Sequence, residues 1–190
     1  EKSGLKANYA KTLIALLFIS ILFTRIGIAG FRTINWHFFF LGTGFLFLET
    51  KGITQLSILF GATWVVCTIV VACFLVMGIV SALIAFKLKP ENRKWIYPLI
   101  FLSLLFNYFF SFQSLLGINE FWQIISAGGL VSLPVFFSGL IFALSFKNSQ
   151  TPSIALGSNL LGAMIGGFAE YLTLLLGFQV LWIFAISLYL

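Results

Sequence analysis

The sequence predicts an all-α fold, a polytopic transmembrane bundle of six or seven helices. Of its 190 residues, 61% are hydrophobic and only 8% are charged, and the mean hydropathy is +1.10. Soluble domains contain about 45–50% apolar and about 25% charged residues, so this chain has too few charges to cover a solvated surface. Its apolar stretches are continuous rather than alternating. Helices are therefore expected, because backbone amides in hydrocarbon must pair within their own segment or in a closed barrel.

Seven apolar stretches follow a polar N-terminal segment, residues 1–11. A spanning helix needs about 20 apolar residues, and the stretches cover residues 12–31, 36–60, 64–86, 95–112, 121–146, 153–175 and 178–190. Arg25 interrupts the first stretch, so both six and seven spans stay open. Trp36, Trp64, Trp95 and Trp122 stand at the starts of stretches, where interfacial aromatic residues are expected.

Small and polar residues mark the boundaries between these stretches. A tight link at 61–63 joins the second stretch to the third, and the strongly hydrophilic loop 87–94 precedes the fourth. Pro134 is expected to kink the fifth stretch. The polar run 147–152 precedes the sixth, and Gly177 precedes the last.

Eleven basic and five acidic residues give a net charge of +6. Basic loops beside anionic lipid headgroups explain this excess, and nothing indicates a nucleic-acid partner. If all seven stretches span, one side of the membrane holds the larger set of basic residues, which are Arg25, Arg32, Lys87, Lys89, Arg93, Lys94 and Lys147. The other side holds Lys2, Lys6 and Lys11. We therefore expect a multi-pass protein of a bacterial inner membrane, with the larger set cytoplasmic.

The second stretch carries charges that are costly in lipid. Glu49 and Lys51 are about 200° apart around a helix and cannot pair well with each other, so each needs a partner on another helix or water. Thr43, Thr50 and Thr54 form one stripe that Lys51 borders. One interpretation is a polar cavity for an ion, a proton or a substrate. The other, which we favour, is an interhelical contact that fixes the packing.

The sixth stretch has a face of small and polar residues. Asn159, Gly166 and Glu170 lie within about 60° on a helical wheel, and Gly162 completes a small-xxx-small pattern with Gly166. This face is expected to pack against the second helix, where Glu170 would neutralise Lys51. The pattern predicts a buried interface more strongly than a binding site.

No catalytic motif is evident in this chain, which is expected to be non-catalytic. His37 stands at a helix start and is expected to be an interfacial residue. Cys67 and Cys73 lack the spacing of metal ligands, so no metal site is expected. No cofactor is predicted. The 24 Phe residues could nevertheless bind a lipid, a quinone or an apolar pigment, because such ligands need no recognisable sequence motif.

Two segments resemble a known family. Residues 37–64 (HFFFLGTGFLFLETKGITQLSILFGATW) and 158–172 (SNLLGAMIGGFAEYL) are similar to stretches of multi-pass, spermidine synthase-like membrane proteins of the aminopropyltransferase type. The resemblance covers roughly residue 36 to the C-terminus. It implies major-facilitator-like helices that follow a soluble Rossmann-like domain. That domain's glycine loop and acidic substrate residues are absent here, so no catalytic residue carries over, and only Glu49, Lys51, Asn159 and Glu170 match the recurring motifs.

Three functions remain open. The first, which we favour, is a non-catalytic membrane subunit or membrane domain that packs with other membrane proteins or with a second copy. The second is half of a facilitator-like transporter, which would need a partner to complete it. The third is the membrane anchor of an aminopropyl- or methyl-transferring enzyme whose soluble domain lies elsewhere. The residues expected to matter are those of the buried polar interface: Glu49, Thr50, Lys51, Thr54, Asn159, Gly162, Gly166 and Glu170.

Overall fold

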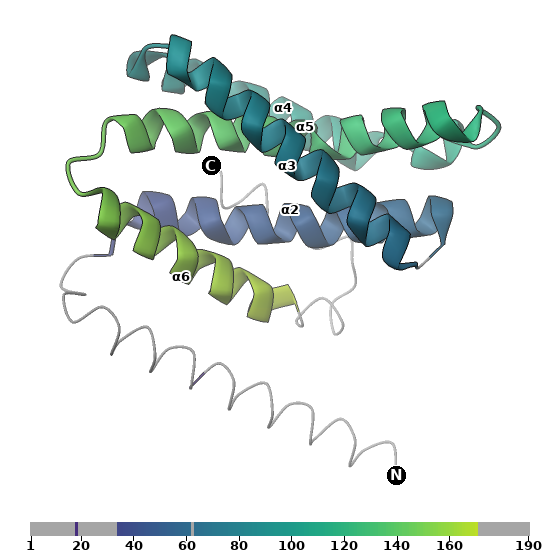
Figure 1. The fold of residues 1–190 in the computed structure, drawn as a ribbon, viewed down its shortest axis with the longest axis horizontal. Coiled ribbons are helices and arrows are strands. Elements are labelled where there is room, and N and C mark those ends of the chain that lie inside the picture. Colours follow the sequence, from purple (N-terminus) through teal and green to yellow (C-terminus); the bar gives the residue numbers. More distant parts are fainter. Residues whose placement is uncertain (1–17, 19–33, 62, 171–190) are drawn as a thin grey trace.

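The computed structural model describes residue 18, residues 34–61 and residues 63–170. These described residues form α-helices and two short 3₁₀ helices without a β-strand, which confirms the all-α class. The elements in chain order are α2 (Trp36–Phe60), α3 (Trp64–Lys87), η1 (Pro90–Asn92), α4 (Arg93–Phe109), η2 (Phe112–Leu115), α5 (Glu120–Lys147) and α6 (Pro152–Glu170). Figure 1 shows them as roughly antiparallel neighbours joined by short connections at the two ends of the bundle.

Local sequence signals set the ends of α2. Asn35 is its N-cap, and its side-chain oxygen accepts a hydrogen bond from the backbone N–H of Phe38 at 3.4 Å. An N-cap of this kind satisfies one of the backbone donors left unpaired at a helix start. Gly61 ends the helix with a φ of +83°, a conformation that glycine adopts without a Cβ clash. The link to α3 is therefore short and turns sharply.

The fourth apolar stretch forms a helix that ends early. α4 begins at Arg93 and stops at Phe109 rather than near residue 112, and the chain then turns through η2. Phe112 and Leu115 of η2 are buried in the bundle. The apolar residues after Phe109 therefore pack in the core although they are no longer part of α4. Pro134, where a kink is expected, lies inside α5, which is one helix from Glu120 to Lys147.

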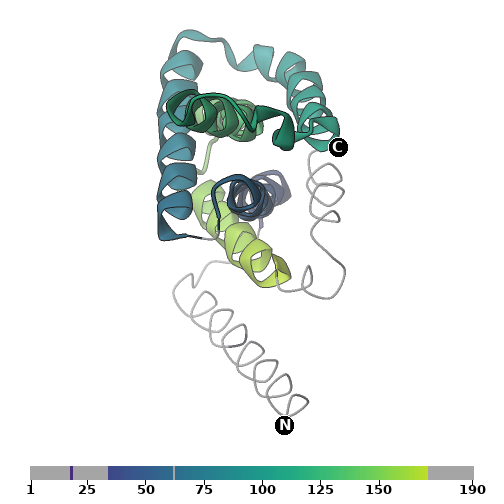
Figure 2. The same cartoon turned by 90° about the vertical axis from the view of Figure 1, so that its right-hand side faces the viewer.

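α2 lies between the other helices and has α6 on one side and α5 on the other (Figures 1 and 2). α3 crosses the outside of the bundle obliquely and packs mainly on α5, and α4 also packs on α5. Large side chains from α2, α4 and α5 fill the core, among them Leu48, Leu56, Ile100, Leu104 and Ile141. The bundle thus has one apolar core, with α3 and α6 on its periphery.

Two helices of the described chain are long and apolar enough to cross a membrane. They are α3, with a mean hydropathy of 2.9, and α5 from Phe121 to Lys147, with a mean hydropathy of 2.0. This finding supports a membrane protein only weakly, and the predicted six or seven spans are not supported by it. The stretches predicted at 12–31 and 178–190 lie outside the described residues, as does the end of the sixth stretch beyond Glu170.

Candidate functional site

The two glycines predicted to form a face on α6 lie directly against the backbone of α2. A Cβ atom at Gly162 would overlap the backbone carbonyl of Phe39, and one at Gly166 would lie 2.9 Å from the carbonyl oxygen of Thr43. On α2, a Cβ at Gly42 would overlap the carbonyl of Asn159. Only glycine allows helix backbones to approach this closely. α2 and α6, the two helices with the most extensive contact in the described bundle, therefore pack backbone against backbone.

Hydrogen bonds cross this glycine contact. Thr43 Oγ1 donates to the carbonyl of Gly162 at 2.9 Å, and Asn159 Nδ2 donates to the carbonyl of Phe38 at 3.1 Å. At the start of α2, the backbone N–H of Asn35 donates to Ser158 Oγ at 3.0 Å. In an apolar environment the hydrophobic effect does not drive helices together, so interhelical hydrogen bonds of this kind contribute to their association. The contact fixes the position of α6 on α2.

The other predicted residues of α2 do not all face α6. Thr54 Oγ1 donates to the carbonyl of Thr50 within the same helix at 2.8 Å, and Thr50 is buried. Glu49 is half-buried and Lys51 is only 6% exposed, and both side chains engage other groups of the protein. The side chain of Glu170 lies outside the described residues, so its expected contact with Lys51 stays a prediction.

Lys51 lines a polar cavity of about 250 Å³ between α2, the end of α4 and η2. The polar residues in the cavity wall are Lys51, Gln55, Asn107, Tyr108, Ser111 and Gln113. Asn107 is 1% exposed, and its Nδ2 donates to the carbonyls of Ser103 and Leu130, each at 3.0 Å. Its Oδ1 has no hydrogen-bond partner among the described residues. This is the one place in the described chain where a buried side chain leaves a polar atom unsatisfied.

A second polar cluster lies at the end of the bundle where α2, α4 and α6 begin. His37 Nε2 is 2.8 Å from Ser145 Oγ, and Arg93 Nη1 donates to the same Oγ at 3.2 Å. The hydroxyl of Tyr97 lies 3.5 Å from His37 Nδ1, which is too long to orient the ring strongly. Ser145 therefore ties together the ends of three helices, and His37 is a packing residue at this end.

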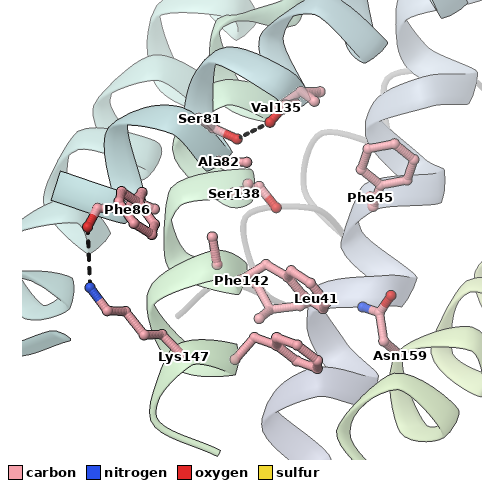
Figure 3. Close-up of a pocket in the computed structure, with 15 residues that line it drawn as sticks. Leu41, Phe45, Ser81, Ala82, Phe86, Val135, Ser138, Phe142, Lys147 and Asn159 are labelled. Atoms are coloured by element: carbon pink, nitrogen blue, oxygen red, sulfur yellow. Dashed lines mark hydrogen bonds between the residues drawn. The ribbon is translucent and has the colours of Figure 1, made fainter. Parts of the chain in front are cut away.

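An apolar cavity of about 590 Å³ lies between α2, α3 and α5 (Figure 3). Leu41 and Phe45 line it from α2, and Phe142 lines it from α5. Lys147 sits at one edge, where its Nζ donates to the carbonyls of Phe86 and Leu88 at 3.2 and 3.3 Å and closes the C-terminal end of α3. The cavity thus offers mainly hydrocarbon surface, which suits an acyl chain or another apolar group.

Within the described ranges, no three His, Cys, Asp or Glu side chains are placed to hold a metal ion. Cys67 is exposed and Cys73 is half-buried, and both are free thiols on α3.

No family model, no curated protein and no solved structure matches the chain. The resemblance to spermidine synthase-like membrane proteins therefore stays a prediction.

The sequence analysis missed Gly42, Ser145 and Asn107. A signal existed for Gly42, because a glycine face on one helix needs small residues on its partner, and the second stretch contains Gly42-Thr43-Gly44. Ser145 and Asn107 carried no local signal. Each matters through residues distant in sequence, which only the fold brings near.

Proposed function

We propose that this chain is a non-catalytic, membrane-embedded helical bundle that serves as a subunit or membrane domain and packs with other membrane proteins. The observation that carries the proposal is the outer face of α3. Leu75, Ile79, Leu83 and Phe86 are between 61% and 81% exposed and form a ridge along this helix. An apolar ridge of this length is expected to contact lipid or another apolar helix rather than water.

The distribution of charge supports a membrane orientation. Lys87, Lys89, Arg93, Lys94 and Lys147 all lie at one end of the bundle, and the sequence has no Lys or Arg from residue 52 to 86 or from 95 to 146. Exposed tryptophans stand at both ends, Trp36 and Trp95 at the basic end, and Trp64 and Trp122 at the other. Basic loops are typically cytoplasmic, and tryptophans collect at both interfaces. The basic end is therefore the proposed cytoplasmic end.

The proposal extends to a multi-pass topology. α3 has 24 residues, which at about 1.5 Å per residue exceeds the roughly 30 Å hydrocarbon core of a bilayer. α2, α4 and α6 run beside α3 and α5 and turn at the same two ends (Figure 1). We propose that they cross with them, so that the stretches 12–31 and 178–190 would bring the total to six or seven spans.

The ridge on α3 also supplies the proposed contact with a partner. Leu75, Ile79 and Leu83 recur at spacings of four residues and Phe86 follows three residues later, which lets another helix pack its own side chains into the grooves beside them. The α2–α6 contact, by contrast, is already filled by backbone and satisfied by hydrogen bonds. The partner is thus expected on α3.

The experiment is extraction followed by native mass measurement. The chain should resist alkaline carbonate and, in mild detergent, should co-purify with a stoichiometric membrane protein or a second copy. Replacing Leu75, Ile79 and Leu83 with Ala should release the partner and leave the chain in the membrane. The matched control replaces Leu99, Leu102 and Phe106, which are exposed on α4, with Ala. Release by carbonate would overturn the membrane assignment, and a monomer in every mild detergent would overturn the subunit role.

One observation favours a second candidate, half of a facilitator-like transporter. A buried lysine lines a polar cavity beside the end of α4 at Phe109. Ionisable residues within a membrane often mark substrate or ion pathways. Under this candidate, reconstituted vesicles would show solute flux that Lys51→Gln removes.

A further inference from the structure

The apolar cavity between α2, α3 and α5 lies where α3 diverges from α2. In its first half α3 lies against α2, since a Cβ at Gly52 would be 3.1 Å from the ring of Phe74. Further along, α3 packs on α5, where Ser81 lies directly against Gly139. Figure 1 shows this oblique crossing. The angle between the three helices holds a cavity of about 590 Å³, within the range of about 300–1,000 Å³ that is typical of ligand sites.

The length of the cavity matches one leaflet of a bilayer. Its wall on α5 runs from Val135 to Lys147, and its wall on α3 runs from Gly78 to Phe86. At about 1.5 Å per residue, the α5 wall is about 18 Å long. The hydrocarbon core of a bilayer is about 30 Å thick, so one leaflet contributes about 15 Å. The cavity starts at the basic end of the bundle and therefore has the length of an acyl chain of that leaflet.

The wall of the cavity is almost entirely apolar. Its polar side chains other than Lys147 are Ser81, Ser138 and Asn159, and each of them already interacts with other groups of the protein. A ligand that brought polar atoms to this depth would give up hydrogen bonds to water without replacing them. A hydrocarbon chain avoids this cost and is therefore the occupant that the wall favours.

Positive charge collects where the cavity reaches the end of the bundle. Lys147 is exposed at the edge of the cavity, and its Nζ donates to the carbonyls of Phe86 and Leu88 (Figure 3). These two hydrogen bonds hold the ammonium at the cavity mouth, and a lysine ammonium has three N–H donors. Residues 87–94, which follow Phe86, add four basic residues and one acidic residue. The mouth thus complements an anionic headgroup, because basic residues at a membrane surface attract anionic lipids.

We propose that this cavity binds an anionic phospholipid, with one acyl chain along the cavity and the phosphate at Lys147. The lipid occupies the angle between the helices and supports the second half of α3, which has left α2. Its headgroup lies at the basic end, in the leaflet proposed to be cytoplasmic. This inference rests on the membrane location proposed above and not on the partner at the α3 ridge.

The test measures the melting temperature of the delipidated full chain in mild detergent. Phosphatidylglycerol is the probe, and phosphatidylcholine with the same acyl chains is the neutral control. Phosphatidylglycerol should raise the melting temperature by several degrees, and phosphatidylcholine by less than half as much. Equal shifts would show adventitious lipid only, and a larger shift with ubiquinone would show a different ligand. Either result would overturn the proposal. A chain that resists carbonate extraction yet shows no shift would overturn it too, while the membrane location would stand.

Variants test where the lipid binds. Gly78→Leu fills the cavity without a clash at Cβ, because a Cβ there meets nothing within 4 Å, and should remove most of the shift in a folded protein. Gly129→Leu on α5 is the matched control and should keep the shift, since its Cβ also meets nothing within 4 Å and Gly129 does not line the cavity. A folded Gly78→Leu protein that keeps the shift would place the lipid elsewhere and overturn the proposal.

A charge variant tests where the headgroup lies. Lys147→Gln retains a hydrogen-bond donor but removes the charge, and should reduce the shift with phosphatidylglycerol to that with phosphatidylcholine. A folded Lys147→Gln protein that still prefers phosphatidylglycerol would overturn the placement of the phosphate.

Discussion

Thr43 of α2 and Gly162 of α6 are joined by a hydrogen bond, in which the threonine hydroxyl donates to the glycine carbonyl at 2.9 Å. The same hydroxyl lies 3.0 Å from the carbonyl of Phe39 in its own helix. A side chain as short as threonine reaches a carbonyl of the next helix only when the two backbones nearly touch. The hydrogen bond and the glycine face are therefore one structural feature.

Gly162→Ala should destabilise the protein, because the new methyl group would overlap the backbone carbonyl of Phe39, which cannot rotate away. Overpacking of this kind costs about 1–3 kcal/mol. The free energy of unfolding in mixed detergent micelles measures the effect. Gly167→Ala is the matched control on the same helix, since a Cβ at Gly167 meets nothing within 4 Å. Equal effects of the two substitutions would contradict the close approach of α2 and α6.

Thr43→Val should weaken the same contact by removing the hydroxyl while keeping the shape of the side chain. Hydrogen bonds between membrane helices contribute about 0.6 kcal/mol on average and at most about 1.7 kcal/mol. The loss should appear in the same unfolding measurement. Thr68→Val serves for comparison, because the Thr68 hydroxyl is exposed and donates only to Trp64 in its own helix. If both variants lose equal stability, the bond to Gly162 contributes nothing.

The sequence predicted the helices better than the contacts between them. Continuous apolar stretches predicted the starts of α2 at Trp36 and of α3 at Trp64. The caps of α2 at Asn35 and Gly61 are findings of the structure that agree with these boundaries. The same continuity hides which face of each helix is buried. Gly162 and Gly166 could be assigned to a face because small residues stand out against large ones. The partner face around Gly42 and the cavity at Asn107 depend on how distant helices meet.

The end of α4 shows a different limit. The apolar run continues through Phe112, so hydropathy alone extends the helix to that residue. In the fold, the chain leaves the helix after Phe109 and turns into η2, where Phe112 and Leu115 are buried in the bundle. Lys51 illustrates the same dependence, because it shares a cavity with Asn107 only where the fold brings α2 and the end of α4 together.

Ser145→Ala should loosen the basic end of the bundle. The hydroxyl oxygen of Ser145 on α5 accepts a hydrogen bond from Arg93 of α4 and contacts His37 of α2. The substitution removes this oxygen and with it the polar link between the three helices. Hydrogen bonds that involve a charged group contribute about 1.5–3 kcal/mol, and partial exposure reduces this, so we expect a loss of about 1–2 kcal/mol. Thermal unfolding in detergent would detect it. Ser153→Ala, at an exposed position in the first turn of α6, should change nothing. An unchanged melting temperature of Ser145→Ala would show that this polar cluster does not stabilise the fold.

The two ends of the bundle should lie on opposite sides of the membrane, with the basic end inside. Single cysteines at Glu91 in η1 and at Ser114 in η2 probe these ends, because both positions are exposed and stand at opposite ends of α4. Native Cys67 and Cys73 are first replaced by Ala. A membrane-impermeant maleimide added to intact cells should label Ser114→Cys and leave Glu91→Cys unreacted, and both should react after permeabilisation. The reverse pattern would invert the orientation. Labelling of both variants in intact cells would mean that α4 does not cross the membrane, and the multi-pass topology would then fail.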